Sequence, residues 1–266
     1  MIITDNYKYI KELNLSAKSI VYIAENNSKC NKKNKTVVIK SFYKSETDLF
    51  IQSDNYPFLI PIEMHFNKLI NNSKICPKIL DYFQDDFEFA VVMEHLNGNW
   101  IELHEYISTK RRLEKCIKKI IKNVIIAIEN LTYKGIYHLD IKPKNIMFNK
   151  ATYQVKILDY EDALYDVENE YPQCKEYAGT IGFCSPEVLL GIRYDVKRSI
   201  VFMLGCLIYS CIEGEQAFEL KNKKYIEKTQ FTRCSETVID LIHKCSHYNP
   251  RERYNLHEIL NNIWFQ

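Results

Sequence analysis

Two short polar segments in the second half of the chain constrain its fold most. The first, residues 138–147, reads HLDIKPKNIM, and the second, residues 157–160, reads ILDY. Together they supply two carboxylates, a lysine and a carboxamide at the spacing that phosphoryl transfer from a metal-bound nucleotide needs. A carboxylate can accept the proton of a hydroxyl nucleophile, and a lysine two positions on can neutralise the transferring phosphate. A carboxamide and a second carboxylate can hold a divalent ion against the phosphate oxygens.

Length, charge and cysteine content narrow the class of protein. A chain of 266 residues can bury a substantial core and form one two-lobed unit or two small domains. The net charge of +2 gives no reason to expect a nucleic-acid or membrane partner, and we expect neither. We also expect a monomer. The nine cysteines are scattered without a C-x-x-C pair. This pattern indicates reduced thiols in a cytoplasmic or nuclear protein rather than disulfides or a zinc site.

The sequence predicts neither a signal peptide nor a membrane span. Residues 1–5, MIITD, lack the basic and then apolar layout of a signal peptide. The longest apolar run, residues 200–212, is interrupted by Gly205 and Ser210 and is too short to cross a bilayer. It predicts a helix that is buried on all sides.

The character of the chain changes near Gly98. Before this glycine, β-branched and aromatic runs predict strands at residues 19–23, 36–40 and 89–93, with one helix at residues 62–70. Residues 29–35, rich in lysine and asparagine, are interpreted as a solvated hairpin tip. We therefore expect a small β-rich region, followed by a linker near residues 94–101.

Helices are predicted to dominate after the linker. Apolar residues recur at helical spacing from Leu113 to Leu131, and Gly135 is a natural residue to follow the end of that helix. The basic side chains of residues 110–122 then form its solvated face. Ser235 is expected to cap a helix that ends at residue 245, and Asn255 a helix that ends at residue 264.

Six motifs in this order resemble those of protein kinases. The segments 138–145 and 157–160 match the catalytic and metal loops. GTIGFCSPE at 179–187 resembles the segment that closes an activation loop, and Arg253 matches the arginine that pairs with its glutamate, here Glu187. VVIK at 37–40 and PIEM at 61–64 resemble the strand and the helix that carry a conserved lysine–glutamate pair. Residues 102–107 and 233–264 look most like the Pim family of Ser/Thr kinases.

The resemblance implies a fold and a reaction. The fold is α+β and bilobal: one kinase domain over residues 1–266, with an N-lobe at about 1–93, a hinge at about 94–101 and a C-lobe at about 102–266. ATP and Mg²⁺ are the implied cofactors, and a serine or threonine hydroxyl of a protein is the implied substrate. Asp140 would be the catalytic base, Lys142 would contact the γ-phosphate, and Asn145 and Asp159 would ligate Mg²⁺.

The same resemblance assigns the nucleotide-binding residues. Lys40 would contact the α- and β-phosphates, held by Glu63. Met93 takes the gatekeeper position behind the hinge. The remaining implied contacts, on the adenine side, are Val21, Val38, Glu94, Leu96 and Met147.

Several positions depart from the kinase pattern. No glycine precedes Gly98, and Asn14, Ser16 and Ser19 stand at the three positions of the glycine-rich loop. Small polar residues keep some access to the phosphates but crowd the loop. The other departures are Glu161 for a glycine after the metal-loop aspartate, Leu139 for the arginine that receives an activation-loop phosphate, Ile200 for an aspartate that braces the catalytic loop, and Asn67 for an apolar residue.

Three classes of function are compatible with these residues. The first is an active Ser/Thr protein kinase with reduced activity, which the six intact chemical positions favour. The second is a pseudokinase that serves as a binding or regulatory scaffold, in which the polar residues persist as a hydrogen-bonded core without turnover. The third is a kinase of small molecules, against which the polypeptide-binding segment 179–187 argues.

Overall fold

The computed structural model divides into two units, Met1–Gly98 and Asn99–Gln266. It describes residues 6–27, 35–53, 55–70, 74–109, 113–166, 168, 172–174, 176–221, 224–227 and 231–266. The division falls inside the linker expected at residues 94–101. Most of the expected hairpin tip at 29–35 and the first part of the basic stretch at 110–122 lie outside the described residues.

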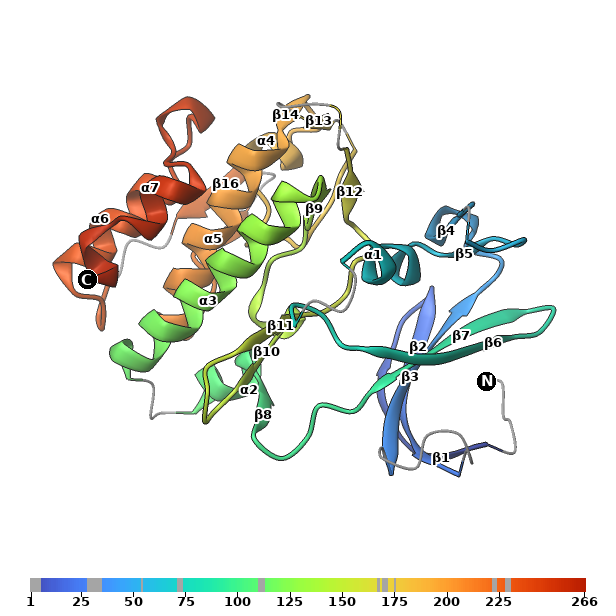
Figure 1. The fold of residues 1–266 in the computed structure, drawn as a ribbon. Helices are drawn as coiled ribbons and strands as arrows, with labels where there is room; N and C mark the ends of the chain where they lie inside the picture. The colour runs from blue at the N-terminus through green and yellow to red at the C-terminus, as the bar shows by residue number, and fades with distance from the viewer. Residues whose placement is uncertain are drawn as a thin grey trace. The chain divides into compact units, whose positions relative to one another are not determined.

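The first unit is built on one antiparallel sheet of five strands in the order β1-β2-β3-β7-β6 (Figure 1). The strands are β1 (Tyr7–Leu15), β2 (Ser19–Asn26), β3 (Thr36–Tyr43), β6 (Ile79–Gln84) and β7 (Glu88–Glu94). The smaller elements are a 3₁₀ turn (Thr47–Leu49), β4 (Phe50–Ile51), β5 (Ile60–Pro61) and helix α1 (Ile62–Ile70).

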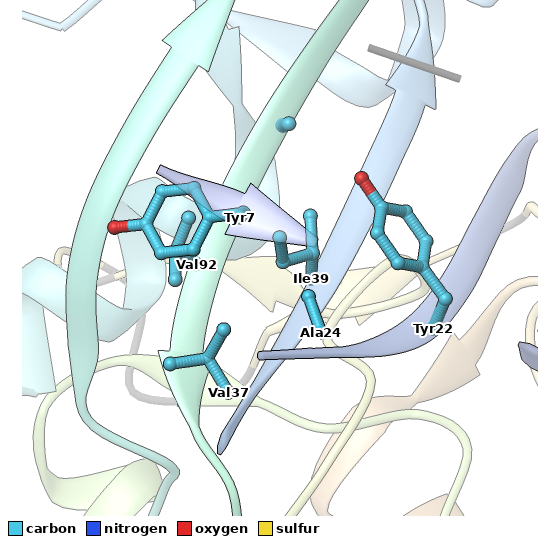
Figure 2. Close-up of a cluster of buried hydrophobic side chains, with 7 residues drawn as sticks. Tyr7, Tyr22, Ala24, Val37, Ile39 and Val92 are labelled. Atoms are coloured by element: carbon cyan, nitrogen blue, oxygen red, sulfur yellow. The ribbon is translucent and has the colours of Figure 1, made fainter. Parts of the chain in front are cut away.

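Alternation along the strands gives this sheet two buried faces. Figure 2 shows the first, where Tyr7, Tyr22, Ala24, Val37, Ile39 and Val92 pack together. On the second, Phe42, Val91 and Met93 pack against Met64 of α1. Because side chains of a strand alternate between faces, Lys40 of β3 shares the second face with Phe42. This parity directs the lysine toward α1.

The two edge strands of the sheet touch each other through side chains. The rings of Tyr7 in β1 and Phe83 in β6 stack at 5.8 Å, and the Tyr7 hydroxyl donates to Asp81 at 2.9 Å. Such contact between opposite edges requires a strongly curved sheet.

The second unit is mainly helical and is organised around α5 (Val196–Glu213). Every residue from Ser199 to Ile212 is buried, which confirms the helix expected to be buried on all sides. Helix α3 (Glu114–Tyr133) runs beside it (Figure 1). The other helices are α2 (Leu103–Ser108), α4 (Pro186–Leu189), α6 (Glu236–Cys245) and α7 (Leu256–Leu260), with 3₁₀ turns at Pro143–Asn145, Pro250–Glu252 and Ile263–Phe265.

Short strand pairs position the loops of this unit. One three-stranded sheet has the order β11-β10-β8, and three two-stranded pairs join β12 to β9, β13 to β14, and β15 to β16. Their bounds are β8 (Trp100–Glu102), β9 (Ile136–Tyr137), β10 (Ile146–Asn149), β11 (Val155–Ile157), β12 (Leu164–Tyr165), β13 (Gln173–Cys174), β14 (Tyr194–Asp195), β15 (Phe218–Lys221) and β16 (Lys224–Glu227).

The helix caps differ from expectation at two places. Helix α6 starts after Ser235 as predicted, but that side chain makes no cap hydrogen bond and donates instead to Glu114 at 2.8 Å. Asn255 does cap α7, through a capping box with Glu258, yet the helix ends at Leu260 rather than at residue 264. A separate 3₁₀ turn, capped by Asn262, follows.

Among the described residues, no helix is both long enough and apolar enough to cross a membrane.

Candidate active site

A buried lysine–glutamate pair lies in the first unit. Lys40 Nζ donates to Glu63 Oε2 at 2.6 Å, and both residues are almost fully buried. The ammonium also lies 5.1 Å from the centre of the Phe42 ring. Burying either charge alone would be costly, so each side chain allows the other to be buried. An ordinary lysine at a solvated strand end would need no such partner. The pairing that the sequence predicted between strand and helix is therefore present.

The turn between β1 and β2 stands where the glycine-rich loop was expected. Strand β1 continues to Leu15 and β2 begins at Ser19, so Asn14 and Ser19 lie in the strands and Ser16 lies in the turn between them. Ser16 Oγ accepts from the N–H groups of Lys18 (3.2 Å) and Ser19 (2.9 Å) and donates to the Ser19 carbonyl (3.0 Å). A serine turn of this kind occupies two N–H donors that a phosphate would otherwise bind.

The residues implied for adenine are divided between the two units. Val21 is the direct cross-strand partner of Lys40, and Val38 is that of Met93; both valines are half-buried. Glu94 ends β7 and accepts from the Lys78 N–H at 2.8 Å, while Leu96 follows it, half-buried. Met147 is half-buried in β10 of the second unit.

A compact hydrogen-bonded set surrounds Asp140 in the second unit. Lys142 Nζ donates to Asp140 Oδ2 at 2.5 Å and to Thr180 Oγ1 at 2.7 Å. Thr180 Oγ1 donates to Asp140 Oδ1 at 2.7 Å. Asn145 Nδ2 donates to Asp140 Oδ2 and to its backbone carbonyl, both at 2.9 Å. The carboxylate thus accepts hydrogen bonds at both oxygens, and these bonds fix its position.

The metal loop is tied to the catalytic loop by backbone contacts. Leu158 N–H donates to the Asn145 carbonyl at 2.8 Å, and His138 Nε2 lies 2.9 Å from the Leu158 carbonyl. The buried His138 ring also packs against Tyr160 at 5.0 Å, so it is a core residue. Leu158 is thus bonded to the catalytic loop through both its N–H and its carbonyl, and Asp159 is the next residue.

Asp159 has an unusual backbone. Its φ is +63°. Among the described residues, Tyr153 is the one other non-glycine residue with a positive φ. Aspartate tolerates this region better than most residues, although it remains strained there. A strained residue held by its surroundings is typical of functional sites, which agrees with a metal-ligating role.

The chain matches the family model described as "Protein kinase domain" over residues 19–265. The chain belongs to the protein kinase family. The kinase resemblance and the α+β fold class predicted from the sequence are therefore confirmed.

Three curated relatives carry Ser/Thr kinase names. Serine/threonine-protein kinase pim-2 of Danio rerio is 29% identical over 189 residues, covering 70% of this chain and 60% of its own length. Serine/threonine-protein kinase prk-2 of Caenorhabditis elegans is 25% identical over 267 residues, covering 97% and 58%. Serine/threonine-protein kinase PSK2 of Saccharomyces cerevisiae is 27% identical over 248 residues, covering 89% and 22%. The chain spans less than two thirds of the length of each of these relatives.

Residues 159–187, which correspond to the activation segment of the protein kinase family, are anchored at several points in their described part. Asp162 Oδ2 accepts from the Gly179 N–H at 3.1 Å, which joins the two ends of the segment. Leu164 and Tyr165 pair with β9, and residues 173–174 pair with β14. Tyr194 Oη donates to the Glu176 carbonyl at 3.2 Å.

Gly179 packs closely against Leu139, which stands where kinases carry an arginine. Its φ is +93°, and a Cβ there would lie 2.5 Å from the backbone oxygen of Leu139. The Leu139 side chain is itself buried. The activation segment is thus held against the catalytic loop by close backbone packing, while an apolar side chain replaces the charged one.

The glutamate and arginine that the sequence paired are joined by two hydrogen bonds. Arg253 donates to the two oxygens of Glu187 at 2.6 and 2.8 Å, and both residues are buried. Two other departures are accommodated locally. Ile200 is fully buried within α5, and Asn67 Nδ2 donates to the Pro77 carbonyl at 2.7 Å.

Sequence reasoning did not identify two contributors to the site. Asp162 carries no motif signal, because its partner lies 17 residues away and is a backbone N–H. Tyr225 bonds to the activation segment from 41 and 43 residues further along the chain. The aromatic residue within a lysine-rich stretch gave no hint of this contact.

Proposed function

We propose that the chain is a Ser/Thr protein kinase that transfers the γ-phosphate of ATP to a protein hydroxyl, with reduced activity. The set of bonds around Asp140 carries this proposal. Its carboxylate accepts hydrogen bonds at both oxygens. It would accept the proton of a serine or threonine hydroxyl. Lys142, bonded to the same carboxylate, supplies positive charge for the phosphate in transfer.

The side chains present fit MgATP. The buried Lys40 is a fixed positive charge suited to phosphate oxygens, and Glu63 prevents it from turning to solvent. Asn145 uses only its Nδ2 in the bonds to Asp140, so its Oδ1 is not committed to them. Amide and carboxylate oxygens are the ligands that Mg²⁺ prefers, so Asn145 and Asp159 would hold it. The bound metal would neutralise charge on the phosphates.

The serine turn is the reason to expect a slow enzyme. Ser16 Oγ takes the Lys18 and Ser19 N–H groups, so fewer backbone donors are left to orient the nucleotide phosphates. Misplaced reacting groups lower the rate steeply. The same turn is the observation that favours the pseudokinase alternative. The intact Asp140 set and the Ser/Thr kinase relatives outweigh it.

A nucleotide-binding assay followed by a kinase assay tests the proposal. We expect ATP to bind more tightly with Mg²⁺ than without it, and phosphate to be incorporated slowly into a mixed serine/threonine peptide library. Asp159→Asn removes a metal-ligating charge and should abolish both the Mg²⁺ dependence and the incorporation. Mg²⁺-independent binding with equal incorporation by wild type and variant would support the pseudokinase instead.

We also propose an intracellular location, cytoplasmic or nuclear. The eight cysteines in the described part of the chain are all free thiols, and six of them are buried. A compartment that keeps thiols reduced is consistent with that state.

Kinase activity is expected not to depend on phosphorylation of the activation segment. Leu139 offers no charge to a phosphate, and Thr180 is already bonded to Asp140 and Lys142. Treating the purified protein with a phosphatase should leave its rate on the peptide library within error. A kinase with the usual arginine at that position serves as the control that loses activity. A large loss from this protein would show that a phosphate is needed. Of the other hydroxyls in this segment that could carry a phosphate, Tyr177 is exposed and Tyr171 lies outside the described residues.

A further inference from the structure

The β15–β16 hairpin presents a tyrosine to the segment that precedes α4. Tyr225 Oη accepts a hydrogen bond from the Gly182 N–H at 3.0 Å and donates one to the Cys184 carbonyl at 2.9 Å. The same oxygen lies 3.2 Å from Cys184 Sγ. One hydroxyl therefore uses both its donor and its acceptor capacity to tie the first and third residues of segment 182–184.

The hairpin that carries this tyrosine is anchored on the core of the second unit. The Tyr225 ring packs on Phe218 of β15 with the ring centres 5.4 Å apart. Phe218 packs in turn on Phe202 of α5 at 5.1 Å. Because Phe202 is fully buried, a continuous row of three aromatic rings connects the hydroxyl to the most buried helix. The position of Oη is thereby fixed by packing.

Gln216, two residues before the β15–β16 hairpin, also contacts this part of the chain. Gly182 has φ of +90°, and a Cβ there would lie 2.9 Å from the side chain of Gln216. The end of the Gln216 side chain therefore packs against Gly182, and the Tyr225 hydroxyl bonds to the N–H of the same residue. Burial raises the pKa of the Tyr225 phenol, so it remains a protonated donor at physiological pH.

Segment 182–184 is connected to the catalytic carboxylate through a neighbouring threonine. Thr180, two residues before Gly182, donates to Asp140, and Ile181 between them is 46% exposed. A shift of the segment would move an exposed surface beside the group that accepts the substrate proton. We infer that Tyr225 is a positioning residue for the protein substrate, because its hydroxyl fixes the backbone of 182–184 beside Asp140. This inference rests on the proposed kinase function.

Kinetics of Tyr225→Phe test the role in substrate binding. The variant keeps the ring and its packing but loses both hydrogen bonds. Using one peptide selected from a mixed serine/threonine library, we expect KM for the peptide to rise roughly fivefold, as the loss of about one net hydrogen bond implies. KM for ATP and the slow hydrolysis of ATP without peptide should not change. An unchanged peptide KM, or equal rises for peptide and ATP, would overturn the inference.

Tyr194→Phe is the matched control. Tyr194 is a buried tyrosine of the same unit, and its hydroxyl also donates to a backbone carbonyl of the activation segment, that of Glu176. Removing that hydroxyl should leave the peptide KM close to the wild-type value. The same rise in both variants would mean that any loosening of the segment has this effect, and the specific role of Tyr225 would be wrong.

Hydrogen exchange gives a readout that does not depend on activity. The Gly182 N–H loses its acceptor in Tyr225→Phe, so exchange in a proteolytic fragment covering 180–185 should accelerate, and Tyr194→Phe should not accelerate it. Unchanged exchange in Tyr225→Phe would show that the hydroxyl does not hold the segment. A wild type that phosphorylates no peptide would overturn the proposed function and the substrate role together. Exchange would then still decide whether the hydroxyl holds the loop.

Discussion

Asp140→Asn is expected to reduce phosphate transfer by roughly two to four orders of magnitude, the usual contribution of a positioned general base. Asparagine has the size of aspartate and can still contact Lys142 and Thr180, so the loop should keep its shape. What it lacks is a carboxylate that can take the proton of the substrate hydroxyl. The measurement is phosphate incorporation into the peptide library at saturating MgATP.

Nucleotide binding separates this loss from a folding defect. Asp140 belongs to the set that would act on the protein substrate, whereas Lys40 and Asp159 would hold MgATP, so the affinity for MgATP should change little. Asp240→Asn is the matched control, because Asp240 is an exposed carboxylate of α6. It should transfer phosphate at the wild-type rate. Equal incorporation by wild type and Asp140→Asn would show that the measured phosphate does not come from this site.

Strongly patterned elements were predictable from the sequence. Strands β2, β3 and β7 were found because β-branched and aromatic residues fill both buried faces of the sheet. Helix α1 has the predicted bounds. Strand β1 was missed, since eight of its nine residues are exposed and charged residues interrupt the apolar ones in its sequence, YKYIKELNL.

The parts of the site carried by local spacing were also predictable. Asp140, Lys142 and Asn145 lie within six residues, and their bonds follow from that proximity. Contacts between distant segments were not predictable from composition or periodicity. The Ser235 hydroxyl bonds to Glu114, 121 residues away, in place of its own helix end. Tyr225 reaches the activation segment in the same way, because tertiary packing decides which partner a hydroxyl meets.

Arg253→Met is expected to destabilise the protein by about 3–5 kcal/mol, the usual cost of removing one partner of a buried ion pair. All five N–H donors of the Arg253 guanidinium are used: two on Glu187, and one each on the carbonyls of His247, Tyr248 and Arg198. Its carbon Cζ also lies 4.9 Å from the centre of the Phe202 ring. Methionine fills the space but leaves the Glu187 carboxylate buried without its counter-charge. The free energy of unfolding, measured by urea denaturation, reports the loss.

Comparison with the neighbouring arginine isolates the buried pair. Arg251 is exposed in the same turn, so Arg251→Met should change the free energy of unfolding by less than about 0.5 kcal/mol, as surface substitutions usually do. Arg253→Lys should recover only part of the loss, because a lysine has three donors and no planar fork for the two carboxylate oxygens. In the double variant Glu187→Gln with Arg253→Met, the buried charge is gone, so the combined loss should fall short of the sum of the single losses. Additive losses would mean that the two side chains stabilise the fold separately. If Arg253→Met has the same free energy of unfolding as the wild type, the guanidinium makes no net contribution to stability.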